Sequence, residues 1–210
     1  MFEILAKVIA LGIASAASPG ILAITVSLLA GKDSPVKNVL AFTFGGVFAA
    51  LFLVFAGSEI WGGALTPDSL LVKHYGNIDV ALGIVFILVG LAQLLPASKE
   101  KSQVVKKHGI FKLILLGFVI NITNFDAVLF NLAALREIIL PDISVLSEFL
   151  LILLADLFFL SPSLVPLAIY LMYPSKTKTI LEPLDIWLKK HGRYVIAGIL
   201  LVIGVWLISA

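Results

Sequence analysis

Long apolar segments of 18 to 30 residues, separated by polar breaks, limit how this chain can fold more than any other feature. The chain is 60% hydrophobic and only 13% charged, and its mean hydropathy is +1.12. An ordinary soluble domain carries about 25% charged residues, so a water-soluble fold of this length has no interior for so many apolar side chains. We therefore expect an all-α membrane protein with a single transmembrane domain over residues 1–210.

A helix needs about 20 apolar residues to cross the hydrocarbon core of a bilayer. The sequence accordingly predicts roughly six spans, at residues 4–30, 36–57, 77–96, 110–136, 143–172 and 192–209. Residues 58–76 are too polar and too rich in Gly and Pro to cross, and are expected to form an interfacial loop. Residues 182–190 are expected to form a short amphipathic surface helix. Three spans then lie in residues 1–98 and three in residues 110–210, with a basic loop at 99–109 between them.

The basic residues predict the orientation of these spans, because Lys and Arg collect in cytoplasmic loops. Twelve of the 15 Lys and Arg residues fall in the connections after the first, third and fifth spans. Only Lys7, Lys73 and Arg136 fall on the other side. We therefore expect a multi-pass protein of the cell membrane with both termini outside the cytoplasm. The Lys-rich stretch 99–112 is interpreted as an orientation signal and not as a nucleic-acid site.

The chain contains no Cys, which excludes disulfides, thiol redox chemistry and thiolate metal sites. Its histidines, His74, His108 and His191, fall in predicted loops without the spacing of metal ligands. No nucleophile and base are paired in the sequence. We expect neither an enzyme nor a resident cofactor, although coupling to a proton or a cation stays open.

Two aspartates lie inside the predicted spans, where an ionisable side chain is costly and points to function. Asp156 lies near the middle of the fifth span, and Asp126 lies nearer one end of the fourth. No Lys or Arg inside the spans is an evident partner, and a carboxylate in that setting is protonated, hydrogen-bonded or ion-bound. Both are candidate proton or cation sites, and the alternative is a neutral Asp hydrogen-bonded across the bundle.

The first and fourth spans both carry polar interruptions. Ser18-Pro19-Gly20 lies in the middle of the first span, where Pro19 removes a backbone hydrogen bond. In the fourth span, Asn121, Asn124 and Asn131 fall within an arc of about 80° if the helix is continuous. Asp126 can line the same cavity as Asn124 only if the helix breaks near residues 123–126.

The fifth span is also interrupted, by Pro162 and Pro166. Ser163 lies seven residues after Asp156, so the two side chains share one face of the helix if the kink is mild.

The interruptions recur at matching places in the two halves of the chain. Adding 105 to residues 12–20 gives residues 117–125, so Ser18-Pro19 overlays Thr123-Asn124. Three spans on each side of the basic loop insert with opposite orientation, and interrupted helices at matching positions of inverted halves indicate the central site of a transporter. The candidate residues for binding a substrate or ion are Ser18, Pro19, Gly20, Asn121, Thr123, Asn124, Asp126, Asp156 and Ser163.

Three short motifs resemble the LysE superfamily of small exporters, and within it the GAP (Sap-like) branch most closely. They are Ser18-Pro19-Gly20, the Asn-x-x-Asn element at 121–124, and Trp187 with His191 before a Gly-rich last helix. The resemblance implies a 3+3 inverted repeat, export of small solutes or lipid-linked molecules, and often a homodimer. The stretch 123–126 also resembles, more weakly, the cadmium and manganese exporters of the same superfamily.

The first functional hypothesis is therefore a secondary transporter that exports a small organic solute, an amino acid or a lipid-like molecule, by alternating access. The second is efflux of a divalent cation, with Asp126, Asp156 and Asn124 as ligands, because hard cations prefer oxygen. The third is a membrane assembly or scaffold protein that transports nothing.

Overall fold

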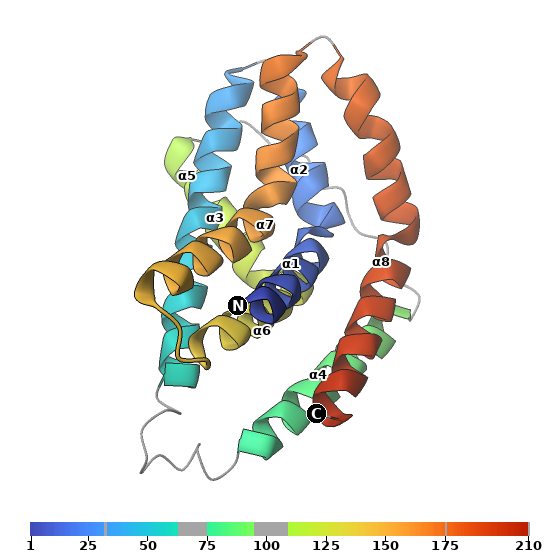
Figure 1. The fold of residues 1–210 in the computed structure, drawn as a ribbon. Helices are drawn as coiled ribbons and strands as arrows, with labels where there is room; N and C mark the ends of the chain where they lie inside the picture. The colour runs from blue at the N-terminus through green and yellow to red at the C-terminus, as the bar shows by residue number, and fades with distance from the viewer. Residues whose placement is uncertain (32, 63–74, 95–108, 175, 210) are drawn as a thin grey trace.

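The computed structural model of the chain describes residues 1–31, 33–62, 75–94, 109–174 and 176–209 (Figure 1). All the regular elements in these ranges are helices. In chain order they are α1 (Phe2–Ala16), α2 (Pro19–Leu29), α3 (Pro35–Gly57), the π-helical turn η1 (Ser58–Gly62), α4 (Tyr75–Leu94), α5 (Ile110–Thr123), α6 (Phe125–Ile139), α7 (Val145–Met172) and α8 (Thr177–Ser209). The predicted all-α class is confirmed for this part of the chain.

Two segments are long and apolar enough to cross a membrane by themselves, namely Pro35–Trp61 and Val145–Met172. Two bent pairs raise the number to four if each pair counts as one span. These pairs are α1 with α2, bent by 58°, and α5 with α6, bent by 73°. Helices α4 and α8 occupy the positions of the third and sixth predicted spans without meeting this criterion over the described residues. Two to four spans are thus supported, and six spans stay a prediction.

The last part of the chain differs from the prediction. We expected a surface helix at 182–190 and a separate span at 192–209, whereas α8 is one helix from Thr177 to Ser209 with Pro183 inside it. The expected break between residues 190 and 192 is absent, because the glycine that follows it is a weak helix breaker: a single glycine inside a helix costs only about 1 kcal/mol relative to alanine. The predicted loops at 58–76 and 99–109 fall mostly outside the described residues, and the described start of the first one is η1.

Helix α7 touches all three apolar clusters of the described core. It contributes Leu151 and Ala155 to the first cluster, Leu167 to the second, and Phe159 and Leu160 to the third. Figure 1 shows α7 bending, so that it runs beside α1 along its first part and beside α2 along its second.

The two prolines of α7, Pro162 and Pro166, are buried, and the helix continues through both. The predicted interruption is therefore a bend inside one helix and not a break.

Glycines bring two pairs of helices into backbone contact. A Cβ atom on Gly45 of α3 would overlap the backbone of Ile114 in α5, and one on Gly117 of α5 would overlap the carbonyl oxygen of Phe42. Gly83 of α4 and Gly204 of α8 face each other in the same way, each against the other's carbonyl oxygen. Small residues at helix contacts are typical of membrane proteins, where close van der Waals packing replaces the hydrophobic effect between helices.

The outer surface of α3 is apolar. Its exposed large side chains follow helical spacing along one side, and they are Leu40, Phe44, Phe48, Leu51, Phe52 and Phe55. A contiguous exposed row of this kind is unfavourable in water and favourable against lipid chains. The surface of the described helices therefore agrees with a membrane-embedded protein.

Candidate functional site

The two helix breaks of the chain meet each other. Ala17 and Ser18 separate α1 from α2, and Ser18 has extended backbone angles, φ −110° and ψ 91°. Asn124 alone separates α5 from α6, with φ −77° and ψ 77°. The Nδ2 atom of Asn124 donates a hydrogen bond of 2.8 Å to the Oγ atom of Ser18. The structure thus joins two residues that lie 106 positions apart in the chain.

The break at Ser18 follows from local chemistry. Pro19 is the first residue of α2, a position that needs no backbone N–H, and its ring disfavours helical angles for the preceding residue. Ser18 is buried, with 4% of its surface exposed. Its carbonyl oxygen accepts the first hydrogen bond of α2, from Leu22, at 3.1 Å. Ser18 therefore starts α2, and its hydroxyl group is directed to Asn124 and not to its own helix.

The break at Asn124 has no proline. Asn is among the preferred residues at the position before a helix, where its side chain usually accepts a hydrogen bond from the next turn. Here the Asn124 side chain makes no such bond, although its carbonyl oxygen accepts one from Val128 at 3.0 Å. The break therefore depends on Ser18, because the Asn124 amide bonds across to the other half of the chain.

Asp126 is hydrogen-bonded to a residue that the sequence analysis missed. The Nε2 atom of Gln93, near the end of α4, donates to the Oδ2 atom of Asp126 at 2.6 Å. Asp126 lies in the first turn of α6, where the helix dipole favours a negative charge. The one available signal was Gln93 itself, a polar amide between apolar residues of the third predicted span.

Asp156 of α7 faces Asn131 of α6. The Asn131 side chain is close enough to interact with the Asp156 carboxyl group, but the two groups are not oriented for a well-formed hydrogen bond. The Oδ1 atom of Asp156 and both polar atoms of Asn131 are buried without a hydrogen-bond partner among the described residues. Three orphaned polar atoms therefore lie at this contact between α6 and α7.

Three other predicted site residues form hydrogen bonds within their own helices and not with Ser18 or Asn124. Asn121 is buried and donates to the carbonyl oxygen of Gly117, one turn earlier, at 2.7 Å. Thr123 is exposed and bonds the carbonyl oxygen of Val119 at 2.7 Å. Ser163 is buried and bonds the carbonyl oxygen of Leu160 at 2.9 Å.

Gly20 is exposed, and a Cβ atom there would meet open space, so close packing does not require a glycine at this position.

The predicted stripe of Asn121, Asn124 and Asn131 is wrong as a straight stripe, because it assumed a continuous helix. The chain bends by 73° at Asn124, so Asn121 lies on α5 while Asn131 lies on α6. The structure shows the other alternative, a helix break near residues 123–126.

The proposed metal ligands do not share a contact. Asn124 bonds Ser18, Asp126 bonds Gln93, and Asp156 faces Asn131. Within the ranges that the structure describes, no three His, Cys, Asp or Glu side chains come together as a metal-binding group would.

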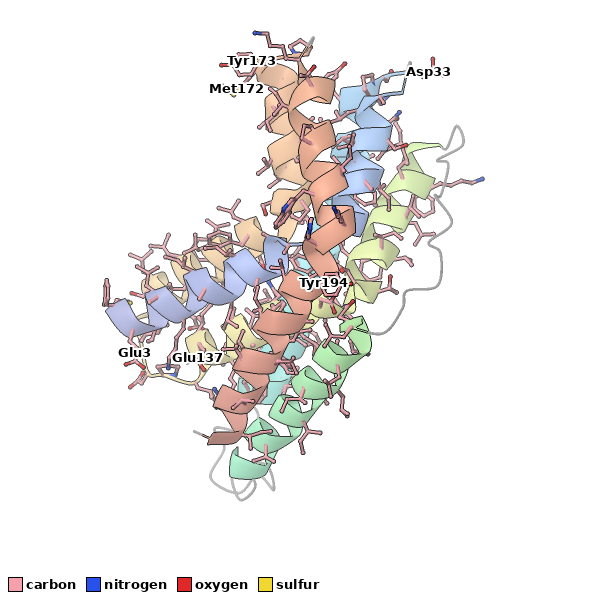
Figure 2. The ribbon with its side chains drawn as sticks, turned by 90° about the vertical axis from the view of Figure 1, so that its right-hand side faces the viewer. Glu3, Asp33, Glu137, Met172, Tyr173 and Tyr194 are labelled. Atoms are coloured by element: carbon pink, nitrogen blue, oxygen red, sulfur yellow. The ribbon has the colours of Figure 1, made fainter. Side chains whose placement is uncertain are left out.

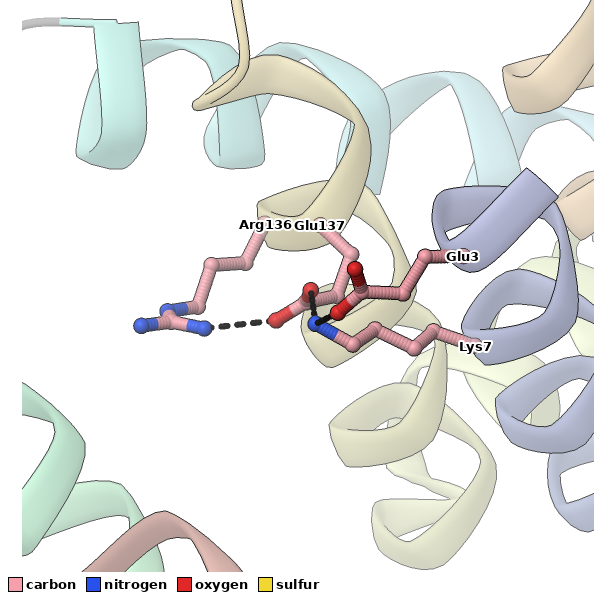
Figure 3. Close-up of polar contacts among 4 residues, drawn as sticks. All are labelled: Glu3, Lys7, Arg136 and Glu137. Carbon is pink, nitrogen blue, oxygen red and sulfur yellow. Dashed lines mark hydrogen bonds and ion pairs between the residues drawn. The ribbon is translucent and has the colours of Figure 1, made fainter. Parts of the chain in front are cut away.

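The ends of α1 and α6 away from the breaks are joined by charges (Figure 3). The Nζ atom of Lys7 lies 3.0 Å from Glu3 and 3.1 Å from Glu137, and Arg136 lies 2.6 Å from Glu137. The Glu137 side chain is only 11% exposed, whereas that of Glu3 is 79% exposed. Figure 2 shows Glu3 and Glu137 near each other, far from Asp33 and Tyr173.

Lys7 and Arg136 predicted only the orientation of the spans, and this cluster was not predicted from the sequence. The available signals were the i,i+4 spacing of Glu3 and Lys7 and the adjacent charges of Arg136 and Glu137. Because α1 packs along α6, the same two helices are held at one end by Ser18–Asn124 and at the other by Lys7–Glu137.

Comparison with known proteins gives one match. The family model described as "Sap, sulfolipid-1-addressing protein" matches residues 8–210. No curated protein and no solved structure matches the chain significantly. The match confirms the Sap-like part of the resemblance, while membership of the wider LysE superfamily stays a prediction. Since the match covers almost the whole chain, the protein belongs to the Sap, sulfolipid-1-addressing protein, family.

Proposed function

We propose that this protein is a secondary transporter that exports a small polar lipid, or a similar organic solute, by alternating access. The hydrogen bond between Ser18 and Asn124 is the observation that carries this proposal. It joins the break between α1 and α2 in the first half to the break between α5 and α6 in the second, and transporters bind their substrates where interrupted helices of two halves meet. Rearrangement of such a contact changes which side of the membrane a bound molecule can reach.

A repeat of the two halves supports the same reading. The order of a broken helix pair and two further helices occurs twice, as α1–α4 and as α5–α8. The overlay of the two halves places Gly12 on Gly117. Gly12 of α1 packs against Phe158 of α7, and Gly117 of α5 packs against Phe42 of α3. Both glycines therefore lie in the first helix of one half, at its contact with the other half. Helices α4 and α8 pair with each other. We infer from these regularities a 3+3 inverted repeat.

The substrate class follows from the family name and from the residues at the breaks. The family is named for addressing a sulfolipid, and we carry over to this chain the broader class of polar lipids. Ser18 and Asn124 are neutral hydrogen-bonding residues, which suit the hydroxyl or amide groups of a head group. The apolar surface of α3 suits acyl chains. An amino acid is the other organic solute that this site accommodates.

Two alternatives have less support. Efflux of a divalent cation needs several oxygen ligands around one point, whereas Asn124, Asp126 and Asp156 each contact a different partner. A scaffold function would not use the paired breaks at all.

The test is transport in liposomes that contain the purified protein. Flux is measured for head-group-labelled polar lipids, labelled amino acids, Mn²⁺ and Cd²⁺. We expect flux of an organic substrate, reduced strongly in Ser18→Ala and Asn124→Ala and unchanged in Ser27→Ala, an exposed serine of α2. We also expect Asp126→Asn to abolish the flux and Asp156→Asn to abolish its response to a pH gradient. Normal flux in all four site variants contradicts the site, cation flux alone favours metal efflux, and no flux of any solute favours the scaffold.

A further inference from the structure

Two buried polar side chains face each other across the contact of α6 and α7 without a charged partner. Asn131 is 1% exposed, and its neighbour in sequence, Phe130, is fully buried. On the facing helix, Ala155 is fully buried directly before Asp156. Asp156 itself is half-buried, and the Oδ1 atom of its carboxyl group is buried. A buried polar atom without a partner is costly, and three of them at one contact need a common explanation.

A proton supplies that explanation. An ionised Asp156 can only accept hydrogen bonds, so it can use the Asn131 N–H groups but leaves the Asn131 oxygen without a donor. A protonated Asp156 donates its O–H to the Asn131 oxygen and accepts the Asn131 N–H on its other oxygen. The neutral acid and the amide thus satisfy each other through two hydrogen bonds, after a small side-chain rotation. We propose that Asp156 is the proton-binding site of this transporter, with Asn131 as the residue that positions the proton.

Asn131 is the side chain that interacts with the Asp156 carboxyl group among the described residues. The other described titratable residues on and around α7 take part in other contacts, lie in the end turns of α7 or are exposed. Glu3, Lys7, Arg136 and Glu137 form the charged cluster, Asp126 bonds Gln93, and His191 stacks with Trp187. Glu148 and Tyr170 lie in the end turns of α7, and Lys37, Tyr173, Lys176, Lys190 and Tyr194 are exposed. A metal cation would need about six oxygen ligands, and this contact offers two side chains.

The position of Asp156 suits a coupling role. Asp156 lies on the part of α7 that packs against α1 and α6, two residues before Phe158, which meets Gly12 of α1. The same helix bends and then packs against α2, on the other side of the first break (Figure 1). Loss of the proton puts a charge at the α6–α7 contact and weakens it, and α7 transmits the change to both sides of the Ser18 break. Proton entry can then accompany substrate export as an antiport.

Proton binding by Asp156 is tested without any substrate, so that this inference and the proposed function can fail separately. Infrared spectra of the full chain in lipid membranes are recorded over a range of pH, following the carbonyl band of protonated carboxyl groups. We expect a band that titrates in the native chain and is absent in Asp156→Asn, which preserves the shape of the side chain. The control Asp142→Asn, in the exposed connection between α6 and α7, keeps the band. Asn131→Leu moves the pH at which the band titrates. Identical spectra in the native chain and Asp156→Asn overturn the proposal.

The coupling of proton movement to substrate transport rests on the proposed function. It is tested with the substrate that the liposome experiment identifies. One proton exchanged for each solute gives an accumulation ratio of about tenfold for each pH unit of gradient. We expect the native chain to respond to the gradient and Asp156→Asn to show the same flux with and without it. An unchanged gradient response in Asp156→Asn overturns the coupling. A titrating band without flux of any solute leaves the proton site intact and contradicts transport instead.

Discussion

The amide of Asn124 lies 2.8 Å from the hydroxyl group of Ser18, and each residue stands at the helix break of its own half of the chain. Neither side chain caps the helix that it precedes. The side chain at each break therefore bonds to the side chain at the other break. This mutual dependence makes the pair the natural place to disturb the proposed transport cycle.

The Ser18–Asn124 bond should appear as a coupling energy. We expect the unfolding free energies of Ser18→Ala, Asn124→Ala and the double variant to be non-additive by about 1 kcal/mol, the usual net value of one hydrogen bond. Equilibrium unfolding in detergent micelles measures all three. Ser27→Ala serves as the control, and strictly additive effects would show that the two groups do not interact in the folded protein.

The charged cluster should depend on Glu137 more than on Glu3. Glu137 is nearly buried and accepts from both Lys7 and Arg136, so Glu137→Gln is expected to destabilise the protein by about 2 kcal/mol, between the values for exposed and buried pairs. Glu3 contacts the same lysine from an exposed position, so Glu3→Gln should have no measurable effect. Thermal unfolding of the two variants compares them directly, and equal losses would refute the assignment.

The contact between α3 and α5 should not tolerate a side chain at Gly117. A Cβ atom there would overlap the carbonyl oxygen of Phe42, so Gly117→Ala must push two backbones apart. We expect a loss of about 1–3 kcal/mol, as for other overpacked positions. Gly198 of α8 has no atom within 4 Å of such a Cβ, and Gly198→Ala is the matched control. Similar stability of the two variants would mean that α3 and α5 are farther apart than in this structure.

The predicted orientation can be read with single cysteines, because the natural chain has none. We expect Asp142→Cys to react with a membrane-impermeant thiol reagent added to intact cells, and Lys176→Cys to react only after the membrane is opened. Both residues are exposed, at opposite ends of α7. The reverse pattern would invert the topology, and labelling of both from outside would mean that α7 does not cross the membrane.

The sequence by itself determined the helical class and the break at Ser18. Apolar runs of membrane length admit little besides helix, and Pro19 acts on the residue directly before it, so the break at Ser18 follows from local rules. The same local reasoning failed between residues 190 and 192, where α8 continues, because a single glycine is a weak helix breaker.

Only the tertiary structure decided which polar groups meet. Gln93 reaches Asp126, Asn131 faces Asp156 and Lys7 reaches Glu137 because the bends of 58° and 73° and the close glycine contacts set how the helices lie against one another. A sequence period describes the face of one helix and carries no information about the helix opposite. For this reason the straight asparagine stripe was wrong, while the hydrogen bond between Ser18 and Asn124 could be seen only in the folded chain.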